Sequence, residues 1–153
     1  MTTFDEIIYS LIEQHRSVAN VLRNTSKVSE RTKFLTDFLA SHIHQNFGLF
    51  IQREVRLEDY VRPNRNRGGI IDLRATNIDL FADWTDRTDT RNDFILDVEI
   101  DTYSKFLSLN KLVHSKSKLG HHVLWVRHTY LGANPAPMSL MTKHNIPVIS
   151  FFT

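Results

Sequence analysis

Four carboxylates in two apolar segments are the residues of this chain that could do metal chemistry. Asp97, Glu99 and Asp101 alternate with apolar residues, so a β-strand there places all three carboxylates on one face. Asp72 lies between apolar residues of an earlier segment, and it would come close to Glu99 if the two segments form neighbouring strands. Carboxylate oxygens suit Mg²⁺ or Mn²⁺, whose remaining positions are filled by water and by phosphate oxygens of a substrate. The pattern therefore predicts a metal site that activates water against a phosphate ester.

A solvated strand is the alternative interpretation of the same residues. Like charges on one strand face repel each other unless that face meets water, cations or a metal. In this interpretation the acids face solvent, and Asp72 pairs with Arg74 or another arginine. Spacing alone leaves both interpretations open.

Apolar periodicity predicts the elements that position these acids. Helices are expected over residues 4–23, from Ser29 to just before Gly48, and from Ser104 to Leu119. Strands are expected over Leu49–Leu57, Ile70–Thr76, Phe94–Asp101, His121–Thr129 and Pro147–Phe152. Thr3 and Glu6 have the spacing of a capping box for the first helix, and Ser29 is the expected N-cap of the second. This order predicts an α/β fold in which helices pack on a mixed sheet.

The composition excludes several classes of protein. The chain has 153 residues, of which 41% are hydrophobic and none is cysteine, so thiolate metal sites and thiol nucleophiles are excluded. The longest unbroken apolar run, Val123–Val126, is far shorter than the roughly 20 residues of a membrane-spanning helix. The first residues show no secretory signal pattern. We therefore expect a single cytoplasmic domain without membrane contact.

The charges are divided unevenly along the chain. All 17 Asp and Glu residues lie within residues 1–101, whereas residues 102–153 carry six Lys and Arg residues and no acid. A basic surface of this kind predicts a polyanionic partner such as nucleic acid. The candidate phosphate contacts are Arg62, Arg65 and Arg67 in a glycine-containing turn, and Lys116 and Lys118 in the third expected helix. A solvated turn and a solvated helix face would show the same pattern.

Several short motifs, taken in order, resemble the PD-(D/E)XK nuclease superfamily. They are Ser29-Glu30-Arg31, Arg53-Glu54, Gly69-Ile70-Ile71-Asp72-Leu73-Arg74 and Leu96-Asp97-Val98-Glu99-Ile100-Asp101, and the resemblance covers roughly residues 29–127. That superfamily has a helix, three-strand, helix, strand core, so the resemblance implies a restriction endonuclease-like fold. On this basis residues 1–28 are an added N-terminal helical extension and residues 29–153 are the nuclease-like core.

The resemblance implies a role for each matching residue. Asp72 and Glu99 would hold Mg²⁺ or Mn²⁺, and the backbone carbonyl of Ile100 would be a further ligand. Glu30 would be an auxiliary acid from the first core helix. The simpler explanation of Glu30 is an acid that is favourable at a helix N-terminus.

Two positions depart from the family pattern. Ile71 stands where the motif has proline, and Asp101 stands where it has a lysine. The family's lysine is thought to orient the attacking water and to stabilise charge in the transition state. We expect Lys105 or Lys111, in the following helix, to supply the missing ammonium group, and Asp101 to act as a third ligand or a base. A degenerate, non-catalytic copy of the fold is the other interpretation.

These observations predict a metal-dependent nuclease that hydrolyses phosphodiester bonds, with DNA as the expected substrate. The alternative is a non-catalytic module on a degenerate nuclease fold, which would bind nucleic acid or another protein. A subunit that needs a partner chain for activity is a third hypothesis. A homodimer would suit the cleavage of two strands, although no residue pattern requires one.

Overall fold

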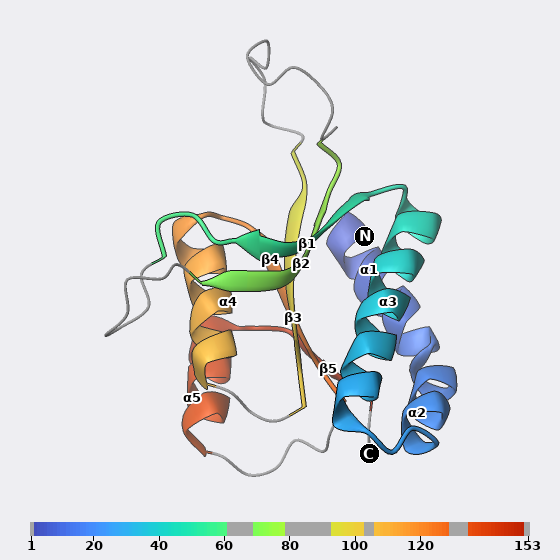
Figure 1. Ribbon diagram of the computed structural model, residues 1–153. Helices are drawn as coiled ribbons and strands as arrows, with labels where there is room; N and C mark the ends of the chain where they lie inside the picture. Colours follow the sequence, from blue (N-terminus) through green and yellow to red (C-terminus); the bar gives the residue numbers. More distant parts are fainter. Residues whose placement is uncertain (1, 61–68, 79–92, 103–105, 129–134, 152–153) are drawn as a thin grey trace.

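A five-stranded mixed sheet forms the centre of the protein, and helices cover both of its faces (Figure 1). The computed structural model describes residues 2–60, 69–78, 93–102, 106–128 and 135–151. The helices are α1 (Thr3–Glu13), α2 (His15–Arg23), α3 (Val28–Phe47), α4 (Phe106–Lys118) and α5 (Pro135–His144). The strands are β1 (Phe50–Arg56), β2 (Ile70–Thr76), β3 (Ile95–Asp101), β4 (His122–Arg127) and β5 (Val148–Ser150). The expected α/β fold with a mixed sheet is confirmed.

The strands follow one another across the sheet in the order β1-β2-β3-β4-β5. β1, β2 and β3 pair antiparallel, whereas β3, β4 and β5 pair parallel. Parallel neighbours require a crossover connection, and α4 and α5 lie in the two crossovers. In Figure 1 the helices α1, α2 and α3 lie on one side of the sheet, and α4 and α5 lie on the other.

Alternation along β3 divides its side chains between the two faces of the sheet. Leu96, Val98 and Ile100 belong to the hydrophobic core that α1, α2 and α3 cover. A second core contains Leu112 of α4 and Trp125 of β4. The acids of β3 alternate with its apolar residues, so they lie on the α4 side, as the period of two predicted. This acidic face is therefore packed against a helix.

The N-terminal segment differs from the single helix expected over residues 4–23. It forms α1 and α2, which are separated at Gln14, and at this break His15 Nε2 donates a hydrogen bond to the Ser150 carbonyl at 2.8 Å. The capping box is formed by Thr2 and Asp5, one residue earlier than expected. A tertiary contact of this kind cannot be inferred from the periodicity of the segment itself.

Two further elements differ from the expectation. α3 begins at Val28 with Lys27 as its N-cap, so Ser29 lies within the first turn, although the helix ends before Gly48 as predicted. α5 was not predicted, because prolines 135 and 137 in its first turn obscure the helical pattern. None of the helices in the described part of the chain is long and apolar enough to cross a membrane.

Candidate metal-dependent active site

Asp72 and Glu99 come together where β2 and β3 separate. The backbone pairing of these strands runs from Thr76 and Ile95 to Leu73 and Val98. Beyond that point the two backbones no longer pair, and hydrogen bonds between backbone amides and side-chain carboxylates link the strands instead. The Asp72 amide donates to Glu99 Oε2 at 3.2 Å, and the Ile100 amide donates to Asp72 Oδ2 at 2.8 Å. The antiparallel register therefore brings the two carboxylates together, as the sequence predicted for neighbouring strands.

Lys111 reaches this carboxylate pair from α4. Its ammonium group forms an ion pair with Glu99 Oε1 and donates a hydrogen bond to the Ile70 carbonyl at 2.7 Å. The side chain of Lys111 is 15% exposed and that of Glu99 is 1% exposed. The expectation that the following helix supplies an ammonium group near the acids is met geometrically by Lys111. Lys105, the other candidate, lies outside the described residues.

Burial is the largest influence on the ionisation of Glu99. It raises the pKa of this carboxyl, the hydrogen bond and negative charge of Asp72 raise it further, and Lys111 lowers it. The result is a pKa of about 9, so Glu99 holds a proton at neutral pH in the metal-free protein.

The solvated-strand interpretation is wrong for this face. Asp97, Glu99 and Asp101 are 0%, 1% and 6% exposed. Arg74, the partner that this interpretation gave to Asp72, pairs with Asp97 and Glu58 instead.

The donor chemistry of the pair fits a small divalent cation. The two carboxylates repel each other when both are ionised, which contributes to the raised pKa of Glu99, and a bound cation would offset this repulsion. Mg²⁺ typically uses one or two protein carboxylates and completes its shell with water and substrate oxygens. Among the described residues no group of three His, Asp or Glu side chains could hold a metal ion. A metal here would therefore depend on Asp72, Glu99 and backbone, water or substrate oxygens.

Asp101 has a structural partner in addition to any chemical role. The indole Nε1 of Trp125 donates to Asp101 Oδ2 at 2.8 Å, and both side chains are buried. A buried indole N–H needs an acceptor, so this bond accounts for an acid at the end of β3.

Glu30 lies in the first turn of α3 and is exposed. This turn is close to the carboxyl ends of β3 and β4, because Thr32 Oγ1 and His128 Nε2 are 3.1 Å apart and the His128 amide donates to the Asp101 carbonyl. Within the described residues no hydrogen bond or ion pair joins Glu30 to Asp72 or Glu99. The structure thus places Glu30 at the same end of the sheet without bringing it into the carboxylate pair.

The other basic candidates are separate from this pair or outside the described residues. Lys116 Nζ donates to the carbonyls of His144 and Asn145, at 2.8 and 2.9 Å, and so ties α4 to the end of α5. Lys118 is exposed at the end of α4. The predicted phosphate contacts Arg62, Arg65 and Arg67 lie outside the described residues.

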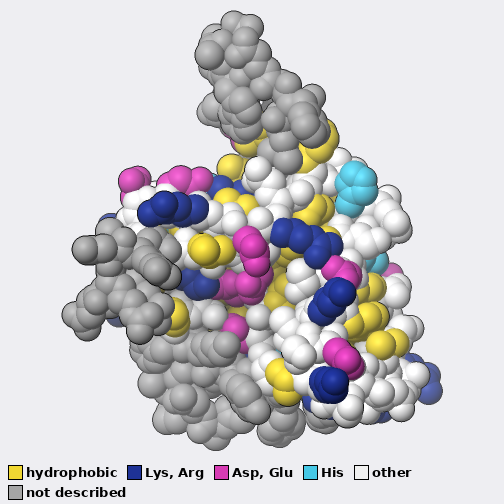
Figure 2. Space-filling view, viewed as in Figure 1, with side chains coloured by type: hydrophobic (Ala, Val, Ile, Leu, Met, Phe, Trp, Pro, Cys, Tyr) yellow, Lys and Arg dark blue, Asp and Glu magenta, His cyan; other side chains and the backbone are white. Residues whose placement is uncertain are grey.

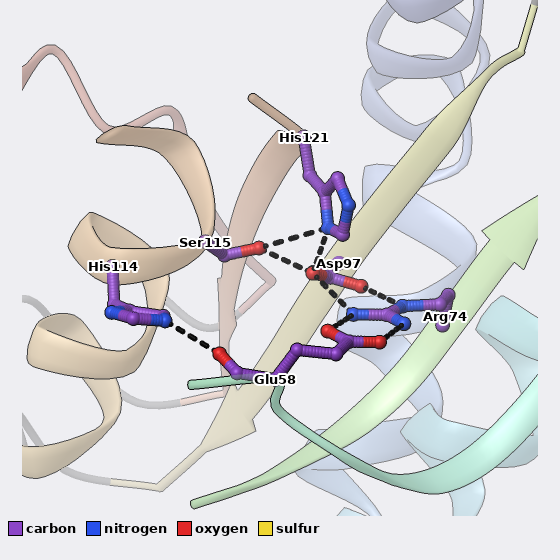
Figure 3. A network of polar contacts seen from close by, with 6 residues as sticks. All are labelled: Glu58, Arg74, Asp97, His114, Ser115 and His121. Carbon is purple, nitrogen blue, oxygen red and sulfur yellow. Dashed lines mark hydrogen bonds and ion pairs between the residues drawn. The ribbon is translucent and has the colours of Figure 1, made fainter. Parts of the chain in front are cut away.

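A second polar network lies on the same face of the sheet, two residues after Asp72 on β2 and two residues before Glu99 on β3 (Figure 3). Sequence reasoning missed this network. Arg74 makes bidentate contacts with both Asp97 and Glu58, at distances from 2.7 to 3.2 Å. Asp97 also accepts hydrogen bonds from Ser115 and from His121 Nδ1, the latter at 2.8 Å. Burial raises the pKa of Asp97, but the hydrogen bonds from His121, Arg74 and Ser115 outweigh it and hold the pKa below its usual value. Arg74 and Asp97 are cross-strand partners, so the register was the missing information.

Comparison of the chain with protein-family models, with curated proteins and with solved structures finds no match.

Proposed function

We propose that this chain is a metal-dependent nuclease with a restriction endonuclease-like core. The order α3, β1, β2, β3, α4, β4 is the helix, three-strand, helix, strand order of the superfamily that the motifs resemble. The proposal rests on one observation above all, the meeting of Asp72, Glu99 and Lys111 at the point where β2 leaves β3. Two carboxylates can hold a divalent cation, and an ammonium group beside them can stabilise the charge that develops in metal-assisted phosphodiester hydrolysis.

Each residue has a distinct role in this proposal. Asp72 and Glu99 would hold Mg²⁺ or Mn²⁺, with the Ile100 carbonyl as a further oxygen ligand. The bound ion would supply an activated water and neutralise charge on the phosphate. Lys111 lies beside Glu99, where its ammonium group can orient the attacking water and stabilise the charge that develops on the phosphate oxygens. Lysine thus reaches the site from α4 instead of from the position of Asp101.

The surface around the sheet is compatible with a DNA substrate. Figure 2 shows Asp and Glu side chains at the centre of the face that carries β1 and β2, with Lys and Arg side chains around them. A polyanion that approaches this face would meet positive charge on either side of the acids.

One observation favours a second candidate function. The Lys111 ammonium already contacts Glu99 in the absence of a metal, as in a buried polar pair of a purely structural site. A non-catalytic module that binds nucleic acid is therefore the competing proposal, and it predicts salt-sensitive binding without cleavage.

The two proposals are separated by titrating Mg²⁺ and Mn²⁺ into the wild type and into Glu99→Gln, Lys111→Ala and Lys143→Ala. Metal binding is followed by calorimetry, and cleavage is followed on single- and double-stranded DNA. The nuclease proposal predicts that Glu99→Gln abolishes both, and that Lys111→Ala keeps metal binding but lowers kcat about 100-fold or more. Lys143→Ala, on the exposed last turn of α5, is the control that removes one surface ammonium group away from the site, and it should cleave at the wild-type kcat. A wild type that binds no metal would overturn the nuclease proposal in favour of the binding module.

A further inference from the structure

The stem of Lys111 is confined on one side by backbone that leaves no room for a side chain. A Cβ atom built on Gly69 would lie 2.9 Å from Lys111 Cδ and 2.7 Å from Tyr60 Cδ1. Real Cβ atoms do not approach other heavy atoms so closely, so a larger residue at this position would displace the lysine stem, the tyrosine ring or both. Gly69, the residue just before β2, therefore permits a three-way contact between itself, Tyr60 in the segment after β1, and Lys111 of α4.

Hydrogen bonds hold the other parts of this contact in place. The Leu57 amide donates to the Gly69 carbonyl at 2.8 Å, which ties the loop after β1 to the start of β2. His114 Nε2 donates to the Glu58 carbonyl at 2.7 Å, and the Tyr60 ring meets the His114 ring edge to face at 5.2 Å. His114 is three residues after Lys111 and lies on the same side of α4. The loop is thus fastened to the helix one turn beyond the lysine.

A lysine that reaches a site from a neighbouring helix needs such support. Its four-carbon stem has many rotamers, so ordering it costs conformational entropy. A wall of backbone and aromatic ring that is already in place removes most of the alternative rotamers before substrate binds.

We propose that Gly69 and Tyr60 are positioning residues that hold the Lys111 ammonium at Glu99 and Ile70. The catalytic part of this inference, the effect on cleavage, rests on the proposed nuclease function. The geometric part, the position of the Lys111 side chain, does not. Replacing Gly69 by alanine should release Lys111 from Glu99 while leaving Asp72 and Glu99 in place.

The geometric part is tested by amine labelling of the folded protein followed by mass spectrometry. Lys118, exposed on the same helix, is the internal standard. In the wild type Lys111 should react much more slowly than Lys118, and Gly69→Ala should raise the Lys111 to Lys118 ratio severalfold. Tyr60→Ala opens the other wall and should raise the same ratio, whereas Tyr60→Phe keeps the ring and should leave it unchanged. An unchanged ratio in both Gly69→Ala and Tyr60→Ala overturns the inference.

The catalytic part is tested by epistasis with Lys111→Ala. Gly69→Ala should lower kcat by a similar factor to Lys111→Ala and leave Mg²⁺ affinity at its wild-type value. In the Lys111→Ala background it should cause no further loss, because the group that it positions is already gone. Equal losses of kcat in both backgrounds would overturn the positioning role. A wild type that neither binds metal nor cleaves would overturn the proposed function alone, since the labelling ratio still decides whether Gly69 and Tyr60 confine the lysine.

Discussion

Replacing Glu99 by glutamine should change how the stability of the metal-free protein depends on pH. Burial, assisted by Asp72, raises the pKa of Glu99 from its ordinary value of 4.5 to about 9 in the folded state. In the unfolded chain the same carboxyl is exposed to water and loses its proton near its ordinary pKa. Between these two values the folded wild type therefore holds one more proton than the unfolded chain does.

The sign and the size of the effect follow from linkage. Because the folded state binds the extra proton, this carboxyl lowers the free energy of unfolding as pH rises from about 4.5 to about 9. One proton corresponds to a slope of about 1.4 kcal/mol per pH unit. Glutamine does not titrate, so the stability of Glu99→Gln relative to the wild type should increase by about 1.4 kcal/mol per pH unit between about pH 5.5 and about pH 8.

Urea denaturation of both proteins in EDTA, at several pH values in this range, measures the difference. Every other ionisable group is present in both proteins, so the contributions that the two proteins share cancel when the two curves are subtracted. Saturating Mg²⁺ should reduce the pH dependence of the wild type and leave that of Glu99→Gln unchanged, because a bound cation favours the ionised carboxylate. Parallel stability curves in EDTA would refute the reasoning, since they would show that Glu99 is already ionised at neutral pH in the folded protein.

Four further substitutions test other parts of the structure. Asp97→Asn should destabilise the protein by about 3–5 kcal/mol in urea denaturation, because it removes one carboxylate from a buried network that includes Arg74; a loss below about 1 kcal/mol, as for an exposed pair, would contradict the assignment. Glu54→Gly should stabilise the protein by about 1 kcal/mol, because Glu54 has a φ of 55°, while Gly48→Ala at φ 65° should destabilise it by a similar amount. A melting temperature below that of the wild type for Glu54→Gly, together with one above it for Gly48→Ala, would rule out the argument from backbone conformation. Asp101→Asn keeps an acceptor for the Trp125 indole, so calorimetry should find Mg²⁺ affinity within about threefold of the wild type, and a loss beyond about tenfold would restore Asp101 as a ligand.

Local pattern was sufficient to predict β2 and β3 and the faces of their side chains. A strand has a side-chain period of two, so the alternation of acids and apolar residues along β3 fixes which of them share a face whatever surrounds the strand. Ile70–Thr76 was predicted with the bounds that the structure shows. α5 was not predicted, because its sequence has only a weak helical pattern. Its position follows from the crossover that must connect the parallel strands β4 and β5.

The environment of each acid depends on residues far away in the sequence. Three acids on one strand face could not be assigned to solvent, metal or protein partners by spacing, because the partners come from other elements. Lys111 of α4 contacts Glu99, Arg74 of β2 contacts Asp97, and Trp125 of β4 contacts Asp101. The sequence could place the candidate lysine in the helix that follows β3. Which lysine of that helix reaches Glu99 depends on how α4 packs over β3.

The sequence by itself determined the carboxylates of the candidate site, the strands that carry them and the helix from which the ammonium group comes. These features follow from residue type and from the short-range periodicity of strands and helices. Only the tertiary structure decided that the acidic face is buried, that Asp72 meets Glu99 where β2 leaves β3, and that Gly69 and Tyr60 confine Lys111. These features depend on strand register and helix packing, which bring Asp72 to Glu99, 27 positions away, and Lys111 to Gly69, 42 positions away, and leave no local pattern.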